Sequence, residues 1–256
     1  MGDVIDTLPL TVLLAAMAIT MFGGFVKGTV GFALPLIMIS GLSAILPPQV
    51  ALAALILPAA LTNAWQALRQ GVGPALHSAR AHWPFITIGL VVMALSAQVV
   101  LAVPLWAFFA IIGVPVVIYS LLQLMGIPMR VPAHRRGLAT VLFGMMAGIL
   151  GGFSAVFGPP TVAYLISLDT EKVEQVRVQG LMFSLGNVLL FGAHLRSGVL
   201  NADTIPFSVL MLLPAFAGMW LGFRMQDRLN RDQFLRATLV VLLVAGLNLV
   251  RRAFFV

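Results

Sequence analysis

The sequence predicts an all-α polytopic membrane protein built from two inverted repeats, each a broken-helix hairpin followed by three transmembrane helices. Three observations carry this prediction: the composition, a weak internal repeat and the distribution of basic residues. Hydrophobic residues make up 61% of the 256 positions and charged residues only 9%, whereas a soluble domain carries about 25% charged residues. Apolar runs of about 20 residues, each long enough to cross a bilayer, recur along the whole chain.

The internal repeat consists of three short matches that occur in the same order in both halves of the chain. The matching segments are Gly23-Gly24-Phe25 with Gly151-Gly152-Phe153, "ALRQG" at 67–71 with "HLRSG" at 194–198, and "WPF" at 83–85 with "IPF" at 205–207. We therefore expect a duplication with one membrane repeat at 1–126 and a second at 127–256. Together the two repeats would form one transmembrane transport domain.

Each predicted repeat begins with an apolar stretch that is too long for a single crossing. Residues 8–41 would form a helix about 50 Å long at 1.5 Å per residue, against a hydrocarbon core of about 30 Å. We therefore expect a hairpin broken near Gly23 to Gly31, and a second hairpin over 136–167 broken near Gly151 to Gly158. Full-length helices are expected at 48–69, 82–102 and 104–125, and at 175–196, 204–224 and 233–252.

The basic residues in the loops favour these hairpins over single crossings. With hairpins, one side of the membrane holds Arg69, Arg80, Arg130, Arg135, Arg136, Lys172, Arg177, Arg224, Arg228, Arg231 and Arg236, and the other only Arg196, Arg251 and Arg252. The positive-inside rule then places both termini on the outer, periplasmic side of a bacterial inner membrane and inverts the second repeat. Inverted repeats with interrupted helices are typical of secondary transporters, whose substrate site lies near the membrane midplane.

The segment "GGFVKGTVGF", residues 23–32, places four glycines and a lysine inside the first apolar stretch. A broken helix there would expose backbone N–H groups and a partial positive charge that suit an anion. Lys27 would add a full charge, at a cost of about 2.5–3.5 kcal/mol that marks it as a functional candidate. The alternatives are that the glycines serve close helix packing and that Lys27 snorkels to the membrane interface.

The second copy of the motif, "GGFSAVFGPP" at 151–160, has no lysine, so the predicted site is asymmetric. Asn63 and Gln66 are three residues apart and share a helix face, and Asn187 lies near the position that matches Asn63. Such buried amides can also serve only to join helices. The candidate substrate-binding residues are Gly24, Lys27, Gly28, Thr29, Gly31, Asn63, Gln66, Gly152, Ser154, Gly158, Thr161 and Asn187.

Missing residue types narrow the chemistry. The chain has no cysteine, which excludes thiolate metal sites and sulfur relays. Its Asp and Glu residues fall near the N-terminus or in predicted loops, so no carboxylate is expected to hold a cation within the membrane. Lys27, His194 or the substrate would have to carry any coupled proton. We expect no metal and no cofactor. We also expect no nucleic-acid partner, because the net charge of +7 resides mainly in loop residues, whose charges determine orientation in the membrane.

The glycine-rich motifs resemble those of the TauE/SafE sulfite exporter family, also called the four-toluene-sulfonate uptake permease family. The similar segments are "GGFVKGTVGFALPLI", "VALAALILPAALTNAWQALRQG", "GILGGFSAVFGPPTVAYLISL" and "LLPAFAGMWLGFRMQDRLNRDQFLRATLVVLLVAGLNLV". Ala33 departs from the pattern, because many members have another glycine there. The resemblance implies a transporter, not an enzyme, that moves small sulfur-containing anions such as sulfite, sulfonates or sulfoacetate, often outward. The expected mechanism is alternating access around a midplane anion site.

Two other function classes remain open from the sequence. Ser154 and His194 resemble the serine–histidine dyad of rhomboid proteases, although Ala155 stands where that motif requires glycine. A purely structural membrane subunit would tolerate the loss of Lys27 without a transport defect. The expected partners are a small anion and the lipid bilayer. The sequence does not specify the oligomeric state, and a homodimer is one arrangement it allows.

Overall fold

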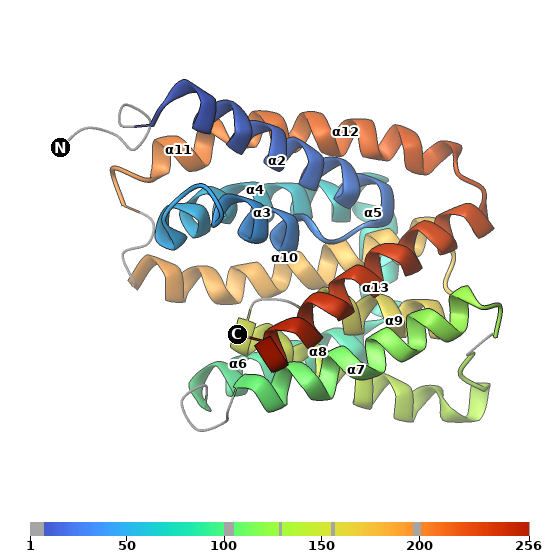
Figure 1. The fold of residues 1–256 in the computed structure, drawn as a ribbon. Coiled ribbons are helices and arrows are strands. Elements are labelled where there is room, and N and C mark those ends of the chain that lie inside the picture. The colour runs from blue at the N-terminus through green and yellow to red at the C-terminus, as the bar shows by residue number, and fades with distance from the viewer. Residues whose placement is uncertain (1–7, 100–104, 128–129, 155–156, 197–200, 256) are drawn as a thin grey trace. The chain divides into compact units, whose positions relative to one another are not determined.

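The structure, a computed structural model, describes residues 8–99, 105–127, 130–154, 157–196 and 201–255, and the elements it contains there are all helices (Figure 1). In chain order they are α2 (Leu10–Val30), α3 (Leu34–Leu42), α4 (Pro48–Leu68), α5 (Val72–Ala81), α6 (Trp83–Val99), α7 (Leu105–Leu124), the short 3-10 helix η2 (Ala133–Arg135), α8 (Arg136–Ser154), α9 (Gly158–Ser167), α10 (Lys172–Arg196), α11 (Ile205–Leu210), α12 (Leu212–Arg228) and α13 (Arg231–Phe255).

Several of these helices are long and apolar enough to cross a membrane. Among the described residues, α2, α4, the α11–α12 segment and α13 meet this criterion by length and composition. The pair α5 and α6 supplies a fifth candidate, with a bend of 78° between its two parts. The prediction of an all-α polytopic membrane protein is therefore confirmed.

The two predicted hairpins are present, but the break in the first lies later than expected. The α2 helix runs without interruption through Gly23, Gly24 and Gly28, and the chain turns only at Gly31 to Ala33. Gly31 has a φ of 93° and Ala33 a φ of 79°, a left-handed conformation that ends a helix. The break therefore begins at Gly31, the last residue of the predicted range, and the expectation of a short first helix is wrong, because Gly23, Gly24 and Gly28 keep helical geometry.

A short helix at the start of the α5–α6 pair was not predicted. The α5 helix occupies residues expected to form a loop, and its N-cap residue Gly71 has a φ of 95°. Its segment contains Gly73 and Pro74 and has low average hydrophobicity, so no long apolar run indicates it. Pro74 lies in the first turn, where proline is tolerated because its missing N–H would be unpaired anyway.

The chain divides into two compact units, and each combines segments from both halves of the sequence. Unit 1 comprises Met1–Gln66 and Asn187–Leu229, and unit 2 comprises Ala67–Gly186 and Asn230–Val256. Two of the unit boundaries fall within α4 and α10, and the third falls between α12 and α13. These units do not coincide with the repeats at 1–126 and 127–256, so those repeat limits stay a prediction.

In unit 1, α2 lies parallel to α12 at very short distance (Figure 1). A Cβ atom at Gly24 would lie 2.3 Å from the Ala215 carbonyl oxygen, and one at Gly28 would lie 2.3 Å from the Met219 carbonyl oxygen. The contact is reciprocal, because a Cβ at Gly222 would lie 2.2 Å from the Phe25 carbonyl oxygen. Two small-residue stripes thus bring the helix backbones together, which is the usual way that membrane helices associate.

The α3 helix returns antiparallel to α2 and closes the core of unit 1. Gly23 faces Leu34 near the start of α3, while Gly41 near its end faces Ile19. The buried core that surrounds α3 consists of Ala16, Leu34, Met38, Leu42, Leu46, Ala51, Ala54, Leu55, Ala59, Phe207 and Met211. It joins α3 to α2, α4 and the α11 segment.

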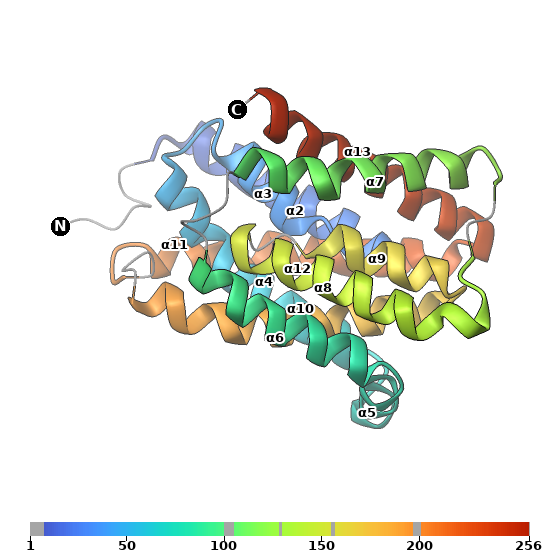
Figure 2. The same ribbon diagram turned by 90° about the horizontal axis from the view of Figure 1, so that it is seen from below.

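In unit 2, α6 pairs with α8 and α7 pairs with α13 (Figure 2). The α8 helix lies parallel to α6, with a Cβ at Gly148 only 2.5 Å from the Gly89 carbonyl oxygen. The α7 and α13 helices are antiparallel, since Gly113 faces Leu249 and Gly246 faces Val116. The α9 helix returns against α8, where the hydroxyls of Thr140 and Tyr164 lie 3.0 Å apart.

The pairing in the two units is reciprocal. The first helix of the first sequence half, α2, pairs with α12 of the second half, and the first helix of the second half, α8, pairs with α6 of the first half. Both pairs are parallel, and both have glycines at the contact. In each pair, the first helix of one sequence half therefore packs in the same way against a later helix of the other half. The inverted orientation of the halves stays a prediction.

Candidate functional site

Lys27 is enclosed near the C-terminal end of α2 in unit 1. Only 1% of its surface is exposed, although a lysine is almost never fully buried unless it is paired. Its amine donates a hydrogen bond to the side-chain oxygen of Asn63, which lies on α4. None of the ion pairs among the described residues includes Lys27. The structure therefore gives this amine a neutral amide as partner, and Lys27 does not snorkel to the protein surface.

Gln66 lies three residues after Asn63 and contacts the turn that follows α2. Its side-chain amide donates a hydrogen bond of 2.9 Å to the Gly31 carbonyl oxygen, and both Asn63 and Gln66 are buried. The left-handed conformation of Gly31 directs this carbonyl out of the α2 hydrogen-bond ladder, while the Gly31 N–H bonds to the Lys27 carbonyl oxygen. One face of α4 thus contacts both the lysine and the helix end beside it.

The helix that starts after this turn has no side-chain cap. Ala33 is the N-cap residue of α3 and provides no capping hydrogen bond, and Pro35 lies in the first turn without an N–H group. The first N–H groups of a helix lack partners within the helix and carry a partial positive charge. The α2–α3 turn therefore combines a cationic side chain and a positive helix end within one hairpin.

Thr29 and Gln226 connect this hairpin to α12. The Thr29 hydroxyl donates to the Phe25 carbonyl oxygen at 2.9 Å, so it caps a carbonyl of its own helix. The Gln226 amide lies 3.4 Å from the Thr29 carbonyl oxygen, and both side chains are buried. Gln226 was not predicted as a site residue, because it lies beyond the helix expected at 204–224 and its contact with Thr29 joins segments far apart in the chain.

The glycines of the motif have a packing role in this structure. Gly24 and Gly28 face the backbone of α12, as the short Cβ distances show. On the α4 side, the Trp65 ring lies 5.3 Å from the Phe216 ring and 5.1 Å from the Phe223 ring. These contacts hold α2, α4 and α12 together around Lys27. Substrate contact by Gly24, Gly28 or Gly31 stays a prediction.

The candidate residues of the second motif lie in unit 2, except Asn187. Gly152 belongs to the end of α8 and Gly158 to the start of α9. Thr161 is fully buried, and its hydroxyl donates to the Phe157 carbonyl oxygen at 2.7 Å. Asn187 is half-buried on α10 and belongs to unit 1. Substrate binding by each of these residues stays a prediction.

The serine–histidine pair lies outside the part of the structure that can be described in side-chain detail. Ser154 is the last residue of α8 and His194 lies near the end of α10, but their side chains are not among the described ones. The protease-like alternative and the proton-carrying role of His194 therefore stay predictions.

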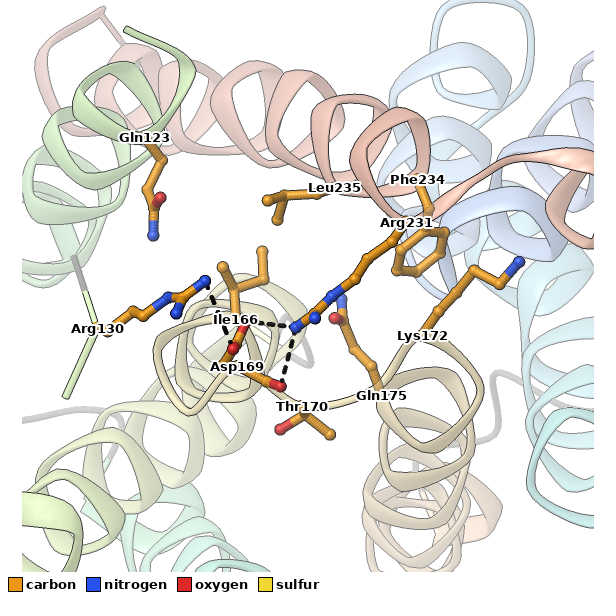
Figure 3. A pocket seen from close by; sticks show the side chains of 10 residues that line it. All are labelled: Gln123, Arg130, Ile166, Asp169, Thr170, Lys172, Gln175, Arg231, Phe234 and Leu235. Atoms are coloured by element: carbon orange, nitrogen blue, oxygen red, sulfur yellow. Dashed lines mark hydrogen bonds and ion pairs between the residues drawn. The ribbon is translucent and has the colours of Figure 1, made fainter. Parts of the chain in front are cut away.

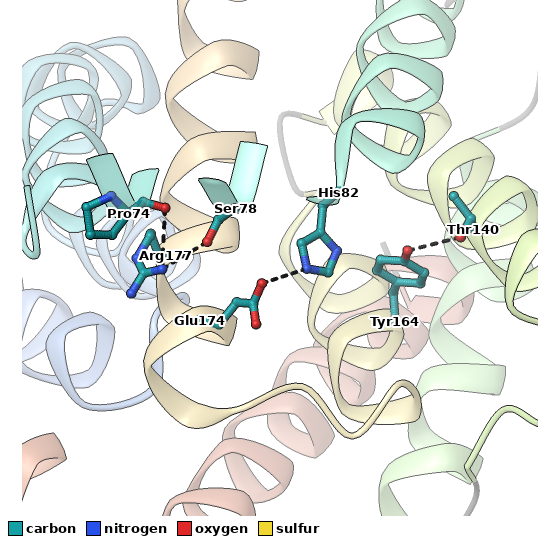
Figure 4. A network of polar contacts seen from close by, with 7 residues as sticks. All are labelled: Pro74, Ser78, His82, Thr140, Tyr164, Glu174 and Arg177. Carbon is teal, nitrogen blue, oxygen red and sulfur yellow. Dashed lines mark hydrogen bonds and ion pairs between the residues drawn. The ribbon is translucent and has the colours of Figure 1, made fainter. Parts of the chain in front are cut away.

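A second polar cluster, in unit 2, fixes the corner between α5 and α6 (Figure 4). The His82 ring nitrogen lies 3.2 Å from a Glu174 carboxylate oxygen, and Arg177 donates to the Ser78 hydroxyl at 3.0 Å. The Tyr164 ring stacks on Phe85 with centroids 4.2 Å apart. These contacts lie at the corner where α5 and α6 meet with a bend of 78°, and the pairing of the groups with one another favours a structural role.

The carboxylates of the described chain lie away from helix interiors. They are Asp169, Glu171, Glu174, Asp203, Asp227 and Asp232, all at helix ends or in connecting segments. An enclosed amine without a carboxylate partner is costly in a membrane and is stabilised by any anion that reaches it. The arrangement suits a small anion, and anion binding by Lys27 stays a prediction.

Comparison with known protein families identifies the chain. The sequence profile described as "Sulfite exporter TauE/SafE" matches residues 16–249, which is more than nine-tenths of the sequence. Comparison with curated proteins and with solved structures gave no significant match. The matched range includes α2 from residue 16 onward, α3, the α8–α9 hairpin, and the helices α6 and α12 that pair with α8 and α2. The chain therefore belongs to the TauE/SafE family of sulfite exporters.

Proposed function

We propose that this protein exports small sulfur-containing anions such as sulfite, sulfonates or sulfoacetate, and that Lys27 is the central residue that binds them. The family supplies the general activity, a membrane exporter of sulfite or related anions. The observation that carries the site is the burial of Lys27 beside the neutral amide of Asn63. A bound anion would supply the negative counter-charge that no carboxylate among the described residues provides to the Lys27 ammonium group.

The hydrogen-bonding capacity of Lys27 suits an oxyanion. A lysine ammonium has three N–H donors and no acceptor, and the Asn63 oxygen accepts one of them. Two donors remain for the oxygens of a sulfite or sulfonate group. The Asn63 side chain, whose oxygen is engaged by Lys27, has an NH₂ group that donates as well. The amine and the amide together can bind two or three oxygens of one ligand.

The α2–α3 turn can contribute backbone donors to the same ligand. The uncapped N-terminus of α3 is a ready anion-binding element, and the bond from Gln66 to Gly31 holds the turn in place. A preformed turn lowers the entropy cost of binding, because few groups have to be ordered when the anion arrives.

Alternating access requires that the site close and open. Lys27 is almost completely enclosed, which fits a closed state in which the amine cannot reach solvent. The exchanged pairing of α2 with α12 and of α8 with α6 supports a duplication, and inverted repeats of this kind typically rock around a central site. The outward orientation of both termini belongs to the same proposal.

The test is anion flux in proteoliposomes, measured for sulfite, sulfoacetate and chloride at several pH gradients. Wild type is compared with Lys27→Ala, and with Arg135→Ala, which removes the same charge from an exposed position. We expect saturable flux of sulfur oxyanions that is lost in Lys27→Ala and kept in Arg135→Ala. Wild-type flux in Lys27→Ala would move the site elsewhere. No flux of any anion would favour the structural or protease-like alternatives.

A further inference from the structure

Unit 2 contains a polar pocket whose residues take no part in the Lys27 site. It has a volume of about 120 Å³ and is formed by α7, the segments before η2 and after α9, the start of α10, and the start of α13 (Figure 3). The lining residues are Gln123, Arg130, Ile166, Asp169, Thr170, Lys172, Gln175, Arg231, Phe234 and Leu235. Since one water occupies about 30 Å³ of liquid, the pocket has room for a group of several heavy atoms.

The pocket has more positive than negative charge. Arg130 and Arg231 converge on Asp169 from opposite sides, as Figure 3 shows, with one Arg130 nitrogen 3.5 Å from the carboxylate. Arg231 also donates to the Asp169 carbonyl oxygen at 3.3 Å. Lys172 is a third cation in the lining. The lining therefore holds three cationic side chains and one carboxylate, and Asp169 pairs with two of the three, Arg130 and Arg231.

Gln175 adds a buried donor to this lining. It is only 3% exposed, and its side-chain nitrogen has no hydrogen-bond partner among the described residues. A buried amide N–H without a partner costs about 1–3 kcal/mol, so such a group calls for a ligand or a water. Figure 3 shows Gln175 and Arg231 among the side chains that line the pocket, Gln175 from the start of α10 and Arg231 from the start of α13.

We propose that this pocket binds an oxyanion group of the sulfate or phosphate type, either free in solution or as the headgroup of an anionic phospholipid. Arginine guanidinium groups match the oxygens of such groups with paired hydrogen bonds. The Gln175 amide would donate to a further oxygen, and Lys172 would contribute charge. The proposal does not depend on the transport function, because it uses none of the residues around Lys27.

The test is binding of sodium sulfate and sodium phosphate to the purified protein, measured by calorimetry at constant ionic strength. The protein is held in nanodiscs of phosphatidylcholine, with or without phosphatidylglycerol. Both wild type and Lys27→Ala are titrated, so that binding at Lys27 can be subtracted. Two variants probe the pocket, Gln175→Leu and Arg231→Gln. The matched control is Arg135→Gln, which removes an exposed arginine that does not line the pocket.

We expect binding that persists in Lys27→Ala, falls about tenfold or more in each pocket variant, and is unchanged in Arg135→Gln. Gln175→Leu removes a buried side chain whose amide nitrogen has no partner among the described residues, so the fold should persist even if Arg231→Gln unfolds. Sulfate binding that phosphatidylglycerol leaves unchanged identifies a free oxyanion as the ligand. Sulfate binding that phosphatidylglycerol abolishes identifies a lipid headgroup. Equal binding in wild type and both pocket variants, or no binding under any condition, would overturn the proposal.

Discussion

The Lys27 amine donates a hydrogen bond to the side-chain oxygen of Asn63, and both residues are buried where α2 meets α4. A neutral amide orients the amine without cancelling its charge, whereas a carboxylate at the same position would cancel it. In the proposed function, asparagine at this position leaves the charge of Lys27 available to an anion.

Asn63→Asp should strongly reduce transport while the protein stays folded. The new carboxylate would pair with Lys27 and compete with the substrate for it, so we expect the sulfite flux to fall by about tenfold or more, since a charged hydrogen bond contributes about 1.5–3 kcal/mol. The same substitution at exposed Asn230 should leave flux unchanged. Flux is measured in proteoliposomes, and retained flux in Asn63→Asp would remove Lys27 from the anion site.

Gly28→Ala and Gly222→Ala should each lower stability through the α2–α12 contact. The added methyl group would lie 2.3 Å from the Met219 carbonyl oxygen in the first case and 2.2 Å from the Phe25 carbonyl oxygen in the second. Neither backbone can yield cheaply, so we expect a loss of about 1–3 kcal/mol. The measurement is thermal unfolding in detergent. Gly137→Ala is the control, because its Cβ would meet no atom within 4 Å, and equal unfolding temperatures in all three variants would contradict this packing role.

Ala33→Gly should stabilise the protein. Ala33 adopts a φ of 79°, and a left-handed conformation costs a residue with a Cβ about 1–2 kcal/mol that glycine avoids. A gain of about 1 kcal/mol corresponds to a rise in unfolding temperature of about 2–4 °C for a chain of this size. Ala237→Gly, in the interior of α13, should lower the unfolding temperature instead. A lower unfolding temperature for Ala33→Gly than for wild type would show that this turn carries no strain.

The expected orientation in the membrane can be tested by labelling introduced cysteines, because the chain has none of its own. Arg135→Cys lies on the predicted cytoplasmic side and Ala202→Cys on the predicted outer side, and both positions are exposed. In intact bacterial cells with a permeabilised outer membrane, a maleimide that cannot cross the inner membrane should label position 202 and not position 135. The reverse pattern would invert the topology while leaving the hairpins intact.

Much of the fold was predictable because membrane helices are recognised by long apolar runs. The hairpin limits 8–41 and 136–167 agree closely with the outer ends of the α2–α3 and α8–α9 pairs. The break inside the first hairpin was misplaced, since a glycine run indicates either a turn or a close helix contact. Only the position of α12 distinguishes the two. The α5 helix was missed because its polar, proline-containing segment resembles a loop.

The candidate site was predictable in part. Lys27, Asn63 and Gln66 stood out as polar residues within apolar segments, and the structure brings all three to the α2–α3 turn. Gln226 and the pocket around Asp169 were not singled out. Each depends on contacts between segments far apart in the chain, and a charged residue in a predicted loop has no sequence signal that separates a pocket wall from a solvated surface.

The sequence by itself determined the class of this protein, because the need to satisfy every backbone polar group within lipid leaves helices as the solution for long apolar runs. It also determined that a lysine would lie within such a run. The tertiary structure alone decided which partner that lysine meets, which glycines pack against α12, and where α2 ends. Those outcomes depend on contacts between helices that are up to about two hundred residues apart in the chain, such as α2 and α12. They also depend on packing at distances of a few ångströms, which no local sequence pattern encodes.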